Sequence, residues 1–295
     1  AYWLARALAA EGAGTEAREQ LKAAAQSTDT FYGQLARAEL DPKATLAFPL
    51  PAMATEEEVR RFLSLDAVQA AVMAHRAGLG QGIVRLFLIQ LRFHLKTEGE
   101  QALLAHLAEA LGDTQLAVRI AKAAIAAGLN LHLYGYPLHP LPDFAPLRAP
   151  PERAMLLAIA RQESEFNQQT VSGAGARGLL QVMPVTAQHV CRDYKLKCDI
   201  PRLLTDNAYN AQIASAYIAD RMVEFRGNYP LTLAGYNAGP GRARQWIREL
   251  GDPGRNVSSL LQEAWKRRPV LVELNVVHGM SREISIDPVL PRLAG

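Results

Sequence analysis

The chain has 295 residues, of which 49% are hydrophobic and 21% charged, a composition that indicates a folded globular protein and excludes disorder. The formal net charge of +3 includes no block of about five or six like charges, so no nucleic-acid-binding face is predicted. No apolar run reaches the roughly 18 to 20 residues that cross a bilayer, so no transmembrane segment is expected. The length suffices for two domains with separate cores.

Residues 1–128 follow a helical pattern almost throughout. The clearest amphipathic segments, several of which end at or near a glycine, are 15–27, 55–64, 66–78, 81–95, 98–112 and 113–128. Thr55 and Glu58 are spaced as a capping box. Short Ala-rich helices stack in pairs, because one helical hairpin cannot bury its own apolar face. We therefore predict an N-terminal helical solenoid, although the irregular repeat length leaves a plain helical bundle open.

Residues 129–151 hold six of the seventeen prolines, which is typical of an extended connector. His132 and His139 in this connector are interpreted as free surface side chains and not as metal ligands. A second helical pattern begins at residue 152 and is predicted to run to residue 166. The chain is thus expected to be all-α, and the predicted parts are 1–128, 129–151, 152–250 and 251–295.

Two acidic residues lie near the end of this second helix. Leu156, Ile159 and Glu163 recur at helical spacing, so Glu163 shares the apolar stripe. Glu165 falls on the flank with Arg161, where a solvated ion pair is expected. A carboxyl group on an apolar face has a raised pKa and stays protonated near neutral pH, as a general acid requires. A stripe that simply ends in water would give the same pattern, and this alternative stays open.

The sequence GAGARG at residues 173–178 has the spacing of a dinucleotide-binding loop. That fingerprint needs a strand before it and a helix after it. Here a helix comes first, and Pro184 follows before any long helix can start, so no nucleotide cofactor is expected. The closely spaced glycines instead favour a tight turn that folds back over the end of the helix.

Three motifs follow one another in this region: Glu163-Ser164, GLLQ at 178–181 and GYNAG at 235–239. Together they resemble the catalytic domain of the soluble lytic transglycosylases of bacterial cell walls, a family with a goose-lysozyme-like fold. The preceding repeats are similar to the helical superhelix of that family. The resemblance implies a periplasmic enzyme that cleaves peptidoglycan between N-acetylmuramic acid and N-acetylglucosamine, leaves a 1,6-anhydro end, and needs no cofactor or metal.

The resemblance also implies a role for each motif residue. Glu163 would protonate the leaving glycosidic oxygen and then take the proton of the sugar's own 6-hydroxyl. The residues expected to bind the substrate, by motif and by chemistry, are Ser164, Ser172, Gln181, Met183, Tyr236 and Asn237. The expected partner is the peptidoglycan glycan strand, with no nucleic acid. A hydrolytic lysozyme on the same fold and a non-catalytic peptidoglycan-binding repeat protein remain alternatives.

Three features stay open in the sequence. The first residue is not Met and no signal peptide follows, so we interpret the chain as a mature form or a fragment. After residue 250 the two motifs with which the family closes this domain are missing, and residues 251–295 are treated as a divergent terminus. Cys191 and Cys198 either close a small disulfide loop in an oxidising compartment or remain free thiols.

Overall fold

A computed structural model describes residues 1–43, 48 and 50–250, so the predicted divergent terminus lies outside the described residues. Within these ranges the regular secondary structure is helical, as predicted, and β-structure is limited to two isolated bridges. No helix among the described residues is both long and apolar enough to cross a membrane. The described residues form two compact units, one within 1–48 and 217–250 and the other within 50–216. The boundaries predicted from sequence stay predictions.

The first unit contains two small helical groups, each with its own core. One group packs around Tyr2, Leu35 and Ala36, and its helices are α1 (Tyr2–Ala10), α2 (Gly14–Ala25) and α3 (Phe31–Leu40). The other packs around Phe225 and Ala243, and its elements are the end of α13 (Asn207–Glu224), α14 (Tyr229–Ala238) and α15 (Pro240–Leu250).

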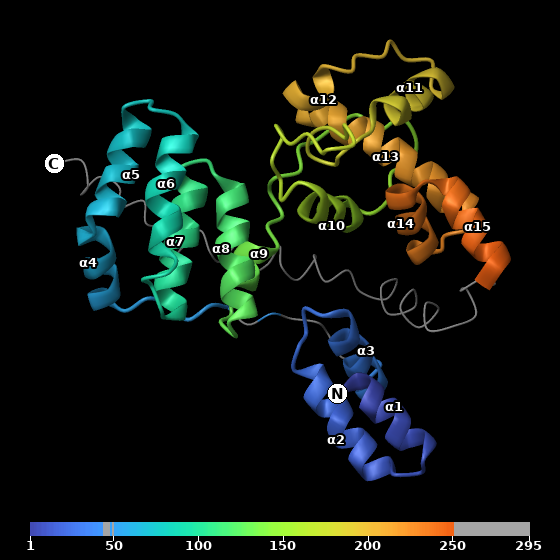
Figure 1. The fold of residues 1–295 in the computed structure, drawn as a ribbon, viewed down its shortest axis with the longest axis horizontal. Helices are drawn as coiled ribbons and strands as arrows, with labels where there is room; N and C mark the ends of the chain where they lie inside the picture. Colours follow the sequence, from blue (N-terminus) through green and yellow to red (C-terminus); the bar gives the residue numbers. More distant parts are fainter. Residues whose placement is uncertain (44–47, 49, 251–295) are drawn as a thin grey trace. The chain divides into compact units, whose positions relative to one another are not determined.

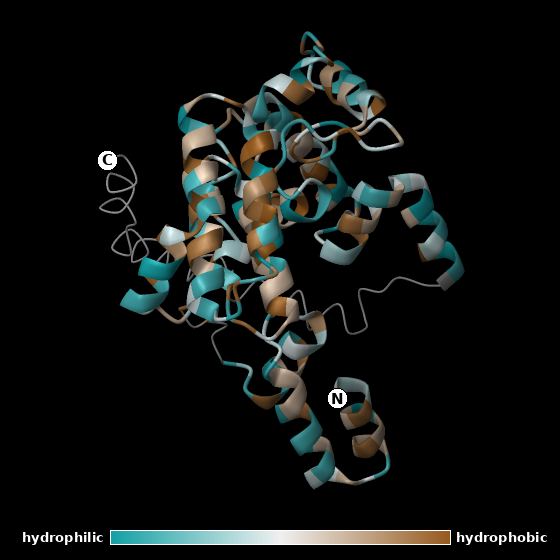
Figure 2. Cartoon of the chain, turned by 60° about the vertical axis from the view of Figure 1, so that its left-hand side comes forward, coloured by the Kyte–Doolittle hydropathy of each residue, from teal (hydrophilic) through white to brown (hydrophobic). Residues whose placement is uncertain are grey.

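The second unit begins with the helical repeats, in which five helices stand side by side (Figure 1). They are α4 (Glu56–Ser64), α5 (Asp66–Arg76), α6 (Gln81–Leu91), α7 (Glu98–Ala110) and α8 (Thr114–Ala126). Their apolar faces, brown in Figure 2, share one core that includes the fully buried Leu88, Leu104 and Ile120. The predicted segments from 55 to 128 are therefore confirmed as packed amphipathic helices.

Capping residues set where these helices begin. The Thr55 hydroxyl accepts a hydrogen bond from the Glu58 amide at 3.2 Å, and the Glu58 carboxylate accepts one from the Thr55 amide at 2.7 Å. The predicted capping box of α4 is thus confirmed. An equivalent box of Thr97 and Glu100 begins α7. Each box satisfies amide groups that have no partner inside the helix, so the starts of these helices are fixed by local sequence.

The remaining helices of the second unit are α9 (His132–Gly135), α10 (Arg153–Glu163), α11 (Pro184–Asp193), α12 (Arg202–Thr205) and the first part of α13. Two predictions are wrong in detail here. The connector is not wholly extended, because Leu131 and Leu133 bury their side chains and α9 packs against α8. Helix α10 ends before residue 166, because Glu165 and Phe166 adopt φ values of 52° and 67°, outside the helical region.

Glu109 on α7 is a half-buried carboxyl group whose charge is penalised by the surrounding core. Burial raises the pKa of Glu109 to about 7, well above the ordinary value of a glutamate. Burial, and then the neighbouring Glu109 carboxylate, raise the pKa of Tyr134 on α9. Because the folded-state pKa of Glu109 is the higher one, the fold binds this proton more tightly than the unfolded chain. Glu109 therefore lowers stability as pH rises from about 4.5 to about 7.

We expect Glu109→Gln to increase the free energy of unfolding at pH 8 by about 1–3 kcal/mol, since the amide removes the cost of a desolvated charge. At pH 4.5 the parental carboxyl group is already largely protonated in the fold, so the gain there should be much smaller. Denaturant unfolding at both pH values measures the difference. An equal gain at pH 4.5 and pH 8 would show that the effect is one of packing and not of charge.

Candidate active site

Glu163 is the last residue of α10, and its side chain is half-buried. Leu156 and Ile159, which precede it on the same stripe, are 2% and 5% exposed, so the stripe faces the interior. A carboxyl group so placed is suited to donate a proton.

A buried serine joins the end of α10 to the glycine loop. Ser164 is 4% exposed, and its Oγ lies 2.6 Å from the Leu179 carbonyl oxygen and 3.2 Å from that of Ala160. A hydroxyl group donates a single hydrogen, and the shorter contact is the one to Leu179. The loop that contains GLLQ is therefore held against the helix end, which confirms the predicted fold-back of the glycine turn.

Two glycines of this loop occupy conformations that disfavour other residues. Gly175 has φ of 89° and Gly178 has φ of 76°, values at which a side chain is strained. A Cβ on Gly175 would meet nothing within 4 Å, whereas one on Gly178 would lie 2.0 Å from the Leu203 carbonyl oxygen. Gly175 thus serves the turn alone, and Gly178 also allows two stretches of backbone to approach closely.

Asn210 on α13 anchors the same loop from within the core. Its side chain is fully buried, and its Oδ1 accepts a hydrogen bond from the Leu180 amide at 3.0 Å. Its Nδ2 donates to the carbonyl oxygens of Arg177 at 2.9 Å and Leu203 at 3.0 Å. Asn210 could not be predicted from the sequence, because no local motif links it to a loop 30 residues earlier in the chain.

The other predicted residues of this unit lie on the loop that follows α10. The Ser172 Oγ accepts a hydrogen bond from the Ala176 amide at 3.0 Å. Gln181 is 8% exposed, and its Nε2 donates to the carbonyl oxygens of Thr170 at 3.0 Å and Gly178 at 2.8 Å. The Gln181 amide hydrogens therefore shape the loop. Met183 is half-buried and precedes the first residue of α11.

Tyr236 and Asn237 lie on α14, in the other unit. Tyr236 is half-buried, and its ring centroid lies 5.9 Å from that of Tyr217. Asn237 is exposed. The roles of these two residues toward the substrate stay predictions.

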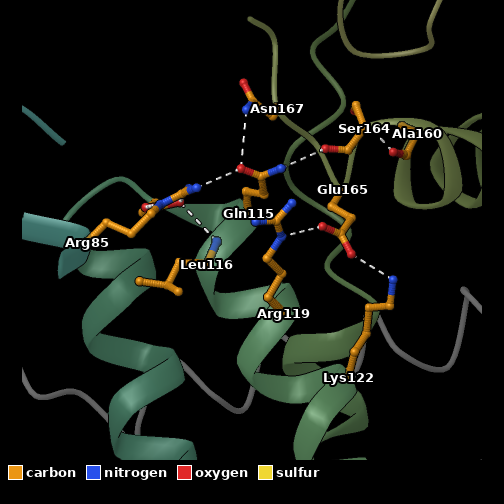
Figure 3. Close-up of polar contacts among 10 residues, drawn as sticks. Arg85, Gln115, Leu116, Arg119, Lys122, Ala160, Ser164, Glu165 and Asn167 are labelled. Atoms are coloured by element: carbon orange, nitrogen blue, oxygen red, sulfur yellow. Dashed lines mark hydrogen bonds and ion pairs between the residues drawn. The ribbon is translucent and has the colours of Figure 1, made fainter. Parts of the chain in front are cut away.

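Glu165 does not pair with Arg161, so that prediction is wrong. Its carboxylate accepts hydrogen bonds from Arg119 Nε at 2.6 Å and Lys122 Nζ at 2.7 Å, both on α8 (Figure 3). Burial raises the pKa of Glu165, but the hydrogen bonds and charges of Lys122 and Arg119 outweigh it and hold the pKa below its ordinary value. Glu165 is therefore ionised at neutral pH and is a poor proton donor.

Arg161 instead fastens α10 to the connector. Its Nε donates a hydrogen bond to the Gly135 carbonyl oxygen at 2.5 Å, and its guanidinium lies 4.0 Å from the centroid of the Tyr136 ring. The His132 ring stacks on the same Tyr136 ring, with the two centroids 6.3 Å apart. The Nδ1 atom of His132 lies 2.7 Å from Asn130 Oδ1. The interpretation of His132 as a free surface residue is therefore wrong.

Cys191 and Cys198 are free thiols in the structure. Cys191 is buried, and desolvation, followed by its contact with Cys198, raises the pKa of the Cys191 thiol to about 11. Its Sγ lies 3.6 Å from the Tyr209 hydroxyl. A disulfide between the two cysteines in protein from an oxidising compartment stays a prediction.

Residues 146–258 match the family model of the transglycosylase SLT domain. This part of the chain is a transglycosylase SLT domain. The SLT domain carries α10, the glycine loop and the helices that follow. A soluble lytic murein transglycosylase from Escherichia coli K12 is 40% identical over 92 residues, which is 31% of this chain and 14% of that protein.

Solved structures extend the likeness beyond the SLT domain. The 70 kDa soluble lytic transglycosylase from Escherichia coli matches 93% of this chain and 44% of its own length, with a TM-score of 0.67 and 26% identity. An inactive mutant of the lytic transglycosylase Slt from Pseudomonas aeruginosa has the same fold, with a TM-score of 0.66 and 22% identity. These matches confirm the predicted fold class, a helical solenoid followed by a lysozyme-like α-helical domain. The chain spans less than half the length of each.

Proposed function

We propose that this chain is a peptidoglycan lytic transglycosylase, which cleaves the glycosidic bond between N-acetylmuramic acid and N-acetylglucosamine and leaves a 1,6-anhydro end. The SLT domain and the E. coli relative, a soluble lytic murein transglycosylase, support this function. The observation that carries the proposal is the position of Glu163 at the end of α10. Its side chain is half-buried, and the loop of the GLLQ motif is hydrogen-bonded to the next residue.

The first step is general acid catalysis by Glu163. The protonated carboxyl group transfers its proton to the glycosidic oxygen, and the bond from that oxygen to C1 of the muramic acid breaks. The electron pair of the bond stays on the leaving oxygen, which becomes a hydroxyl group. The substrate's acetamido group helps to stabilise the cationic centre at C1, as in substrate-assisted glycosidases, so a second catalytic carboxylate is not required.

The second step uses the same side chain as a base. The Glu163 carboxylate takes the proton of the sugar's 6-hydroxyl group while its oxygen forms a bond to C1. One group serves twice because the first step leaves it in the protonation state that the second step needs. No water is consumed, and exclusion of water from the site favours the intramolecular hydroxyl over hydrolysis.

The remaining motif residues are proposed to bind the glycan strand. Ser172, Gln181 and Met183 would contribute from the loop after α10. Tyr236 would add an aromatic face, and Asn237 an amide suited to N-acetyl groups. Ser164, whose hydroxyl is engaged by Leu179, would act through the shape of the loop. The substrate places the proposed site of action in the bacterial periplasm.

The mass of the products tests the proposal. After incubation of the chain with purified sacculi, we expect soluble muropeptides that are lighter by one water than the products of a lysozyme. Products that carry the additional water would identify a hydrolase on the same fold. Absence of soluble muropeptides would contradict an enzymatic function.

A further inference from the structure

We infer that helix α8 of the helical repeats positions Glu163 for catalysis, with Arg119 and Lys122 acting through Glu165. Arg119, Lys122 and Glu165 are positioning residues, since none of them reacts with the substrate. The inference rests on the proposed function, because Glu163 must be the catalytic group for its position to affect turnover.

The contact between α8 and the end of α10 consists of two charge-assisted hydrogen bonds to one carboxylate. The Glu165 side chain is 18% exposed, whereas those of Arg119 and Lys122 are 48% and 42% exposed. Each oxygen of the carboxylate has its own cation, at 2.6 Å and 2.7 Å. Two cations one helical turn apart thus fix both the place and the rotation of the carboxylate.

Gln115 forms a second contact one turn earlier on α8 (Figure 3). It is 8% exposed, and its Nε2 donates to the Ser164 carbonyl oxygen at 3.3 Å. Its Oε1 accepts from Asn167 Nδ2 at 3.2 Å and from Arg85 Nη1 at 3.0 Å. Arg85 is in turn held by the buried Asp113 carboxylate. The side-chain amide of Gln115 is therefore fixed before it binds the segment after Glu163.

The backbone after Glu163 needs such support. Glu165 and Phe166 both have positive φ, which residues with side chains adopt only where their surroundings impose it. The Phe166 ring is buried, and the Glu165 carboxylate is held by α8. On the other side of Glu163, Arg161 is bonded to the connector. The catalytic residue thus lies between two fastened neighbours on the same chain.

Removing these contacts should affect turnover more than folding. Partly exposed ion pairs contribute little to stability. The rate of a proton transfer, in contrast, depends on the distance and direction between donor and acceptor, and a misplacement of about 1 Å can lower it by about 100-fold. Loss of the contacts between α8 and Glu165 should therefore lower kcat.

The test replaces both cations in Arg119→Met/Lys122→Met, with kinetics on soluble uncrosslinked glycan strands. We expect kcat to fall by about 10-fold while KM stays within about twofold, since substrate contacts remain. The thermal midpoint should fall by no more than about 3 °C. Glu165→Gln should lower kcat equally, and adding it to the double variant should cause no further loss, because the three residues act as one unit.

Two comparison variants separate position from charge. Arg60→Met/Lys22→Met also removes two cations, taken from exposed pairs with Glu56 and Glu19, and should leave kcat unchanged. Arg119→Lys/Lys122→Arg keeps both cations and should restore most of the lost kcat. A loss of kcat in Arg60→Met/Lys22→Met equal to that in Arg119→Met/Lys122→Met would show that net charge, and not the contact with α8, controls turnover. That result would overturn the inference.

Hydrogen exchange gives a readout that does not need turnover. The amides of Ser164 and Phe166 bond to the Ala160 carbonyl oxygen, and that of Asn167 bonds to Ser164. We expect these amides to exchange about 10-fold faster in Arg119→Met/Lys122→Met than in the parent. Unchanged exchange, or faster exchange with a parental kcat, would contradict the inference. A parent without any turnover would contradict the proposed function, whereas exchange would still decide whether α8 holds this segment.

Discussion

Replacement of Glu163 by glutamine should lower the rate of anhydro-muropeptide release by about 10² to 10⁴-fold, the usual cost of losing general acid catalysis. The amide keeps the shape of the side chain but has no proton to transfer, so both proposed steps fail. Binding of glycan strands should change little, since the amide retains most polar contacts. Initial rates on purified sacculi, together with a pull-down of the same sacculi, measure the two effects separately.

Glu165→Gln is the natural comparison, because it makes the same chemical change two residues away. Glu165→Gln should still release anhydro-muropeptides but with kcat lowered by about 10-fold. It weakens the contacts of Arg119 and Lys122 with the segment after Glu163 and leaves the proton donor in place. The low pKa of Glu165 already makes it unsuited as an acid. Near-parental activity of Glu163→Gln together with an inactive Glu165→Gln would show that the wrong carboxyl group has been assigned.

The second large effect concerns stability and comes from Gly178→Ala. The new Cβ would lie 2.0 Å from the Leu203 carbonyl oxygen and 2.5 Å from Asn210 Nδ2, so backbone and a buried amide must both move. We expect the free energy of unfolding to fall by about 3–5 kcal/mol, the sum of a strained φ and an overpacked core. The loop that borders Glu163 moves with Gly178, so activity should fall as well.

Gly175→Ala is the matched control for this prediction. Its φ is similar, but a Cβ there meets nothing within 4 Å. It should therefore cost only the strain of the backbone, about 1–2 kcal/mol. Denaturant unfolding of the two variants isolates the steric part. If the free energy of unfolding falls equally in both variants, the close approach of Gly178 to Leu203 does not contribute to the destabilisation.

Local features of the sequence predicted most of the fold. The helical spacing of apolar residues predicted the helices between residues 55 and 128, and the capping box of Thr55 and Glu58 predicted the start of α4. Both features depend only on residues within one or two helical turns of each other. The end of α10 was predicted wrongly. Glu165 and Phe166 are compatible with a helix by propensity, and only their tertiary contacts impose positive φ.

The candidate site was predictable only where its residues form motifs. Glu163, Ser164 and the GLLQ loop are close in sequence, so their spacing could be read directly. Gln115 precedes Ser164 by 49 residues, and Arg119 precedes Glu165 by 46 residues. Nothing in the local sequence of α8 distinguishes these side chains from an ordinary solvated helix face, and only the packing of α8 against the end of α10 reveals them.

In the proposed reaction the sugar's own hydroxyl group, and not water, attacks C1 after Glu163 has donated its proton. Digestion of sacculi in water enriched in the heavy oxygen isotope, followed by mass spectrometry of the released muropeptides, tests it most directly. A lytic transglycosylase adds no solvent oxygen, so we expect anhydro-muropeptides of the same mass in normal and enriched water. Muropeptides that carry the heavy oxygen at a new reducing end would show that the chain is a hydrolase.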